Sequence, residues 1–289
     1  MLDPAPSAVS PAIANTFASW SPPIPLTVLI ALLALIYLRG FVLIRRTRPA
    51  LFTDLRLASF LTGAALLWIA VASPMDSFAD ALLSIHMVEH LLLMCAIPPL
   101  LLYGLPVVPL LRGVPAPLRR SILGRLLRQR WLRRIVHWLV IPRVAFLAMN
   151  FGYLVWHVPA LYDLGLENEG WHAVEHFSFL VPSLLFWYTI LWPWPARPQN
   201  RPWSAILYLL VSDVIMTVLC AFLTFCDRPV YPYYTAHPNP FGISVLNDQV
   251  LGAVSMWVLG SFAFLIPAIS ITFRLLSPQR TTSAAITSR

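Results

Sequence analysis

Long apolar runs constrain the fold of this chain more than any other feature of its sequence. A membrane-spanning helix needs about 20 mostly apolar residues. Of the 289 residues, 58% are hydrophobic and 11% are charged, whereas soluble domains carry roughly 25% charged residues. The sequence therefore predicts an all-α, polytopic integral membrane protein with about seven transmembrane helices. The predicted spans are Ile24–Ile44, Leu57–Ala72, Leu82–Leu102, Val144–Trp156 with an extension toward Ile135, Val174–Trp192, Trp203–Phe225 and Val250–Phe273.

Charges in the connecting segments predict how the helices cross the membrane. One set of alternate loops holds nearly all the loop arginines: Arg45, Arg46, Arg48, Arg56, the run from Arg112 to Arg134, Arg197, Arg201 and Arg274. The other set holds a single arginine, Arg228, and the carboxylates Asp76, Asp80, Asp163, Glu167, Glu169, Asp227 and Asp248. Because arginine-rich loops stay in the cytoplasm, we expect the N-terminus outside and the C-terminus in the cytoplasm. Residues 1–280 then form one transmembrane domain, and 281–289 form a disordered tail.

The net charge of +8 is explained by this topology and does not call for a nucleic-acid partner. Within the basic loop, the residues Leu118, Ile122, Leu126 and Trp131 can share one apolar side of a helix. Such a segment is typical of an interfacial helix that lies on anionic lipid. A docking site for a cytoplasmic partner is the alternative.

Two matching H-x-x-E-H segments carry the most informative polar side chains. One runs from His86 through Glu89 to His90 in the third predicted span, and the other from His172 through Glu175 to His176 at the start of the fifth. On a helix, positions i, i+3 and i+4 share a face, so each helix presents two imidazoles and one carboxylate on one side. Because lipid disfavours these groups, the two faces are expected to point into the bundle. They predict a metal or cofactor site, with polar helix pairing as the alternative.

Other candidate groups fall at the same predicted end of the spans. His157 ends the fourth span and Asp248 opens the seventh, so both join the predicted metal site. Imidazole ligands suit copper, zinc and iron, whereas cysteine and methionine favour Cu(I). Asp213 lies near the middle of the sixth span. An intramembrane carboxylate is either functional or held by neighbouring hydrogen-bond donors, and the sequence leaves both open.

Three parts of the chain together resemble the CtaG-type cytochrome c oxidase assembly factors. The first is His86–His90 with its continuation to Pro106, and the second is Trp156–Asp163 followed by His172–Phe177. The third is Asp248–Gly252, which continues to Met256 and Trp257. The family pattern is matched position by position at His86, His90, His157, His172, His176 and Asp248.

The resemblance implies an assembly factor of the bacterial cytoplasmic membrane, a metallochaperone rather than an enzyme. Its expected cargo is copper, as Cu(I) or Cu(II), taken up on the outer side and passed to a haem-copper oxidase. Expected partners are cytochrome c oxidase subunits, a periplasmic copper chaperone and the lipid bilayer. The expected metal-site residues are His86, Glu89, His90, His157, His172, Glu175, His176 and Asp248.

Three other functions stay open at this point. H-x-x-E-H is also a zinc metalloprotease motif, although one catalytic zinc does not need the motif twice. Histidines on facing helices can instead ligate haem in an electron carrier. A transporter that uses Asp213 is the third alternative, with the repeated motif as the trace of an internal repeat.

Overall fold

The computed structural model of the protein describes residues 9–126, 128–196 and 202–277, and every element within them is a helix. Six helices are long and apolar enough to cross a membrane: α2 (Ile24–Arg45), α3 (Asp54–Ala72), the joined α5 (Leu83–Leu91), η1 (Leu92–Ala96) and α6 (Ile97–Tyr103), α13 (Glu169–Leu191), α14 (Pro202–Phe225) and α16 (Val245–Leu276). The remaining helices are α1 (Val9–Ser19), α4 (Met75–Ala81), α7 (Val107–Gly113), α8 (Ala116–Leu118), η2 (Arg119–Leu123), α9 (Gly124–Leu126), α10 (Arg130–Leu139), α11 (Pro142–Trp156), α12 (Pro159–Glu167) and α15 (Pro232–Ala236). The prediction of an all-α, polytopic membrane protein is confirmed.

The fourth predicted span is bent. α10 and α11 meet at 68°, because Pro142 begins α11 and the residue before it, Ile141, takes an extended ψ of 124°. A proline disfavours helical backbone in the residue that precedes it. The predicted extension toward Ile135 is present as α10, and the bend at Pro142 takes it off the axis of α11. α11 alone has 15 residues, fewer than the about 17 that a span needs, so the bent pair together makes the seventh candidate span.

The third span is the central helix of the bundle. In its most apolar stretch 67% of the residues are buried, against 22–33% in the other five long helices. Pro98 has no N–H to donate to the carbonyl of Met94 one turn earlier, and the helix widens there into the π-helical turn η1. The indole Nε1–H of Trp187, on α13, donates instead to that carbonyl at 2.9 Å. This bond ties α13 to the third span below the two histidine motifs.

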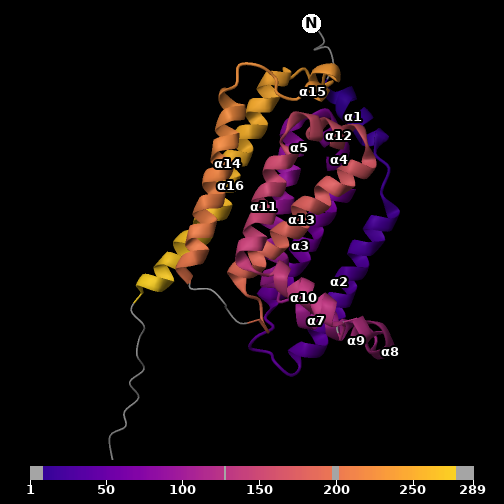
Figure 1. Ribbon diagram of the computed structural model, residues 1–289. Coiled ribbons are helices and arrows are strands. Elements are labelled where there is room, and N and C mark those ends of the chain that lie inside the picture. Colours follow the sequence, from indigo (N-terminus) through magenta and orange to yellow (C-terminus); the bar gives the residue numbers. More distant parts are fainter. Residues whose placement is uncertain (1–8, 127, 197–201, 278–289) are drawn as a thin grey trace, which may run out of the picture.

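The bundle has two chemically different ends, which Figure 1 shows at the top and bottom of the view. α4, α12 and α15 lie at the top, which we call the histidine end. α7 to α10 lie at the bottom, the arginine end, and carry the described part of the basic loop. Arg197, Arg201 and the predicted tail 281–289 lie outside the described residues. Because the structure contains no membrane, the assignment of the histidine end to the outer side stays a prediction.

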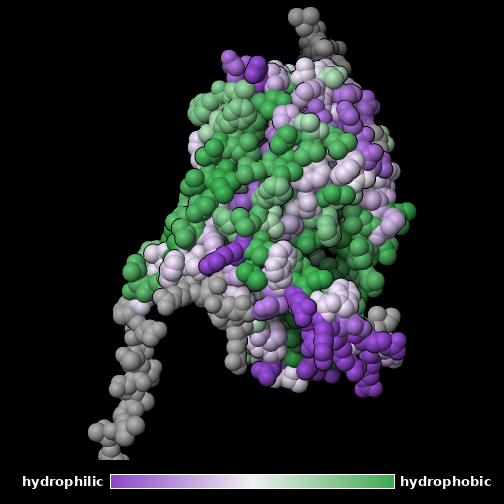
Figure 2. All heavy atoms as spheres, in the orientation of Figure 1, coloured by the Kyte–Doolittle hydropathy of each residue, from purple (hydrophilic) through white to green (hydrophobic). Residues whose placement is uncertain are grey.

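A broad apolar surface lies between the two ends. On the face drawn in Figure 2, hydrophobic side chains cover the flank formed by α14 and α16, and hydrophilic ones gather over the basic helices at the arginine end. Phe151, Phe225 and Phe273 are among the most exposed large apolar side chains. Leu118, Leu126 and Trp131 are also exposed, whereas the side chain of Ile122 lies outside the described residues. A surface of this kind suits lipid contact; the interfacial role of the basic segment stays a prediction.

Two glycines allow the first span to dock on α7. A Cβ on Gly40 would lie 1.7 Å from the carbonyl oxygen of Pro109, and a Cβ on Gly113 would lie 1.8 Å from that of Ile36. Only glycine lets two backbones approach this closely. The contact fixes α7 against α2 at the arginine end.

Candidate metal centre

The two H-x-x-E-H segments face each other inside the bundle, on α5 and α13. His86, Glu89 and Glu175 are fully buried, and His90 is 1% exposed. The i, i+3, i+4 spacing places the three groups of each motif toward the facing helix, as the sequence predicts. Ionisable groups buried this deeply are costly unless they pair with each other or bind a cation.

The carboxylate of each helix approaches a histidine of the other. Glu175 Oε1, from α13, lies 3.5 Å from His90 Nε2 and 4.0 Å from His86 Nε2 on α5. In the other direction, Glu89 Oε1 lies 3.2 Å from His176 Nε2. Each helix therefore directs its glutamate toward histidines of the facing helix. Glu175 faces His86 and His90, whereas Glu89 faces His176.

Three of these residues form a cluster with the dimensions of a metal site. One ligand atom each from His86, His90 and Glu175 can be chosen so that all lie within 4.8 Å of one another. Both ring nitrogens of His86 and of His90, and both carboxylate oxygens of Glu175, are buried without a hydrogen-bond partner among the described residues. Buried polar atoms normally have such partners. Two imidazoles and a carboxylate that lack them fit a bound metal cation.

The remaining histidines of the two motifs form a second tier beside this cluster. The ring centroids of His172 and His176 lie 4.1 Å apart. His172 is 5.5 Å from His86, and His176 is 5.9 Å from His90. The structure thus brings all four motif histidines together.

His157 joins the cluster from the end of α11. Its ring centroid lies 6.4 Å from that of His90, and its Nδ1 lies 2.7 Å from the carbonyl oxygen of Tyr153. Because a carbonyl oxygen only accepts, Nδ1 carries the proton and Nε2 of the neutral ring keeps a free lone pair. Nε2 is buried with no hydrogen-bond partner among the described residues.

Asp248 lies in the first turn of α16, as the sequence predicts, and its carboxylate is held at the start of α5. Its carboxylate accepts hydrogen bonds from the backbone N–H of Leu83 at 2.7 Å and of Ser84 at 3.2 Å, and from the Ser84 hydroxyl. These are the free N–H groups that begin α5, where a carboxylate is favourable. Asp248 therefore orients the helix that carries His86 and His90, and we leave it out of the ligand set proposed below.

Tyr162 is a member of the site that the sequence reasoning missed. Its ring centroid lies 5.1 Å from that of His86 and 6.4 Å from that of His90, and 4.1 Å from that of Tyr231. Its hydroxyl is buried. Tyr162 stands in the segment Trp156–Asp163 that carries the family resemblance, and this was the one signal that could have marked it.

The sulfur-containing side chains of the third span and Asp213 are the remaining candidate groups. Met87, Met94 and Cys95 are buried in the apolar core. Asp213 has one buried carboxylate oxygen without a hydrogen bond among the described residues. Its neighbour Ser212 accepts a hydrogen bond from Asn150. Both roles considered for Asp213, a functional one and a hydrogen-bonded structural one, stay predictions.

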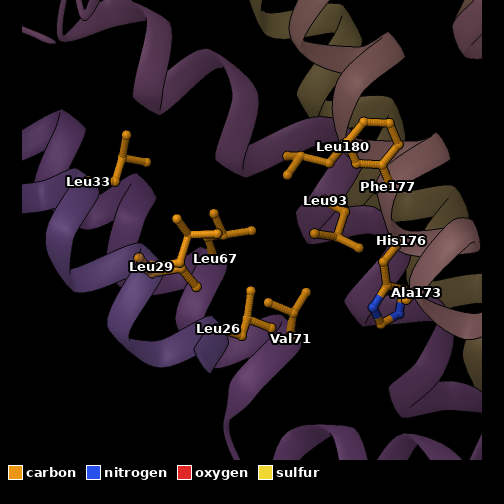
Figure 3. A pocket seen from close by; sticks show the side chains of 11 residues that line it. Leu26, Leu29, Leu33, Leu67, Val71, Leu93, Ala173, His176, Phe177 and Leu180 are labelled. Atoms are coloured by element: carbon orange, nitrogen blue, oxygen red, sulfur yellow. The ribbon is translucent and has the colours of Figure 1, made fainter. Parts of the chain in front are cut away.

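The site is flanked by one apolar and one polar pocket. The apolar pocket has a volume of about 430 Å³ and opens between α2, α3 and α13. Figure 3 shows leucines on most of its wall and the His176 ring at one side. The polar pocket has a volume of about 410 Å³ and lies at the histidine end. Both pockets reach Val71, Ala173 and His176.

Comparison with known proteins gives one family and several relatives. The model of the family described as cytochrome c oxidase caa3 assembly factor (Caa3_CtaG) matches residues 35–277. An uncharacterized protein of Mycobacterium bovis and one of Mycobacterium tuberculosis are each 30% identical over 236 residues, which is 78% of this chain and 35% of the relative. An uncharacterized protein of Mycobacterium leprae is 27% identical over 229 residues, 76% of this chain and 34% of the relative. The chain thus spans about a third of the length of these relatives, and no solved structure matches it significantly.

Proposed function

Because this chain belongs to the cytochrome c oxidase caa3 assembly factor family, we propose that it supplies copper to a haem-copper oxidase during assembly. The proposed copper ligands are His86, His90 and Glu175. The observation that carries the proposal is their clustering within 4.8 Å while their buried nitrogen and oxygen atoms lack hydrogen-bond partners. The membrane-spanning helices and the membership of an oxidase assembly family agree with this role. The identification of copper as the cargo is part of the proposal.

Imidazole and carboxylate ligands suit Cu(II), and imidazole also binds Cu(I). Further imidazoles lie close to the cluster. Their ring centroids are 5.5–6.4 Å from those of His86 or His90, and they belong to His172, His176 and His157. A cation held by His86 and His90 can therefore exchange ligands stepwise without entering lipid. Such exchange is what a carrier needs, because it must bind its cargo and also release it.

The proposal includes the setting of the protein. We place it in the bacterial cytoplasmic membrane with the histidine end on the outer side, because the arginine-rich segments favour the cytoplasm. Copper would arrive from a periplasmic copper chaperone and leave to an oxidase subunit. Association with cytochrome c oxidase follows from the family; the subunit contacted belongs to the proposal.

A zinc hydrolase is the second candidate, favoured by one observation. Two histidines of H-x-x-E-H with a distant glutamate are the ligand set of catalytic zinc, and His86, His90 and Glu175 have that composition. The motif glutamate Glu89, however, lies 3.2 Å from His176, which engages the carboxylate that would act as base. The ligands are also buried, whereas a peptide substrate needs access to the metal. These two features favour metal carriage over hydrolysis.

Haem ligation fits the site poorly. The ring centroid of His86 lies 4.2 Å from that of His90, 5.5 Å from that of His172 and 5.1 Å from that of Tyr162. On another side, Phe179 lies 4.4 Å from His90. Rings this close on several sides leave no plane for a flat macrocycle between two imidazoles.

The test is complementation of a strain that lacks the gene and assembles its oxidase poorly. The wild-type protein should restore copper-loaded, active oxidase, and the His86→Ala/His90→Ala variant should leave oxidase that contains haem but lacks copper. His237→Ala is the matched control, because His237 is exposed and its ring contacts Tyr233 rather than the cluster. Full restoration by His86→Ala/His90→Ala, at equal protein levels, would refute the proposal.

A further inference from the structure

The polar pocket at the histidine end joins the protein surface to the second tier of histidines. Its polar wall includes the carboxylates of Asp76 and Asp80, on α4, and of Glu169, the first residue of α13. His172 and His176 line the same pocket. One cavity of about 410 Å³ thus has an acidic wall and an imidazole wall.

The acidic wall concentrates negative charge. Asp76 and Asp80 are four residues apart on α4 and therefore share one face. Among the described residues, neither these two nor Glu169 forms an ion pair with an arginine. Burial, together with repulsion from Asp80 and Glu169, raises the pKa of Asp76 to about 6. A cation among the three carboxylates would relieve this repulsion.

A fully buried carboxylate lies directly behind the pocket. Gly165 lines the pocket from α12, and a Cβ on Gly165 would lie 2.6 Å from Glu175 Oε2. Glu175 has no exposed surface and no hydrogen-bond partner for either oxygen among the described residues. The Nε2 atom of His172, on the pocket wall, also lacks one. Unpartnered ligand atoms therefore lead from the pocket toward the buried cluster.

The apolar pocket offers a cation no comparable route. Its wall is formed by leucine, isoleucine, valine, alanine and phenylalanine side chains, with His176 as the polar exception (Figure 3). A charged ion that crossed this wall would lose its hydration without gaining ligands, which is strongly unfavourable. Entry from the acidic side offers the ion carboxylate oxygens first and imidazole nitrogens next, so that it gains ligands as it loses water.

We propose that this polar pocket, which we call the vestibule, is a capture site where Asp76, Asp80 and Glu169 bind an aquated divalent metal cation before it passes to His172 and His176. The role as an entrance rests on the proposed function, since the cation is then handed to His86, His90 and Glu175. Carboxylate oxygens suit an ion that still holds its water, whereas the imidazoles suit it once that water is lost. The transfer is ligand exchange, with no change in the charge of the metal.

The first test measures how fast purified full-length protein in detergent takes up Cu²⁺ after rapid mixing at low ionic strength. The variant Asp76→Asn/Asp80→Asn/Glu169→Gln should load at least about 10-fold more slowly than wild type, because electrostatic focusing raises association rates about 10- to 1,000-fold. The final copper content should be unchanged. The matched control is Asp163→Asn/Glu167→Gln/Asp227→Asn, which removes the same charge from residues that do not line the vestibule and should load within about 2-fold of wild type.

The second test separates the vestibule from the buried site. Mn²⁺, which prefers oxygen ligands, is added to the His86→Ala/His90→Ala protein, and bound Mn²⁺ is followed by electron paramagnetic resonance. Retention of Mn²⁺ by this protein, and its loss when the three carboxylates are also neutralised, would support the vestibule even if the wild type held no copper. In that case only the proposed copper function would fail. Absence of Mn²⁺ binding, equal binding after neutralisation, or unchanged Cu²⁺ loading would overturn the vestibule.

Discussion

Substitution of Gly165 by alanine should weaken metal binding without unfolding the protein. The new Cβ would lie 2.6 Å from Glu175 Oε2, whereas ordinary contact begins at 3.4 Å. The carboxylate must therefore move by about 0.8 Å, several times the roughly 0.2 Å tolerance of a metal–ligand distance. The other nearby atoms, Glu175 Cδ at 3.5 Å and Trp156 Cζ3 at 3.7 Å, are in ordinary contact. Since only the end of a flexible side chain is displaced, the fold should accept the change.

We expect Gly165→Ala to lower copper affinity by about 10- to 100-fold, the range seen when groups that orient a metal ligand are disturbed. The thermal unfolding midpoint should stay equal or rise, because alanine is the better helix former by about 1 kcal/mol. The assay is competition for copper against a chelator of known affinity, together with thermal unfolding in detergent. Gly152→Ala is the control, because the nearest atom to its Cβ, the Ser178 carbonyl oxygen, lies at 3.4 Å. Copper affinity within about 2-fold of wild type for Gly165→Ala would refute the assignment of Glu175 as a ligand.

Three further predictions test other parts of the structure. Asp248→Asn should lower the free energy of unfolding by about 1.5–3 kcal/mol, since it removes the charge from the hydrogen bonds at the start of α5. It should leave copper stoichiometry unchanged, and loss of copper from a stably folded variant would show that Asp248 is a ligand. Gly113→Ala should destabilise the protein by about 3 kcal/mol or more in thermal unfolding, because its Cβ meets backbone, the Ile36 carbonyl oxygen at 1.8 Å; stability equal to that of Gly152→Ala would refute the close packing of α2 on α7. The Cu²⁺ loading rate should fall as the pH drops through about 6, because Asp76, with its pKa raised to about 6, is charged above that pH and neutral below it. Asp80, Glu169 and His172 line the same pocket, so the rate of Asp76→Asn should still fall, but less than that of wild type between pH 7 and pH 5; equal falls would contradict the role of Asp76.

Most of the membrane fold could be predicted from the sequence, because the lipid bilayer allows few backbone structures. In lipid, an apolar run of about 20 residues can hydrogen-bond all its backbone N–H and C=O groups within itself only as a helix. Six of the predicted spans are found in the structure, as α2, α3, α5–α6, α13, α14 and α16. The bend between α10 and α11 could not be read from hydropathy, since it depends on Pro142 and on the extended backbone of Ile141 before it. Pro98 leaves the Met94 carbonyl without its helical donor, and the group that donates to it instead, the Trp187 indole N–H, is 93 residues away in the sequence.

For the candidate site, helical spacing was enough to place His86, His90, His172 and His176 on two inward faces. It could not predict which glutamate contacts which histidine across the two helices: Glu175 approaches His90, and Glu89 approaches His176. That pairing depends on the relative height and rotation of two helices that are distant in sequence. Tyr162 was missed for the same reason, because only the folding of α12 over the bundle brings its ring against His86.

Metal analysis of the purified full-length protein tests the central claim most directly. After loading with copper and removal of the excess, the wild type should retain about one copper per chain. Once copper held weakly in the vestibule has been stripped with a chelator, His86→Ala/His90→Ala/Glu175→Gln should retain almost none at the same protein concentration, and His237→Ala should match the wild type. A wild-type protein that retains no copper, or a triple variant that retains as much as the wild type, would contradict the assignment of His86, His90 and Glu175 as the copper site.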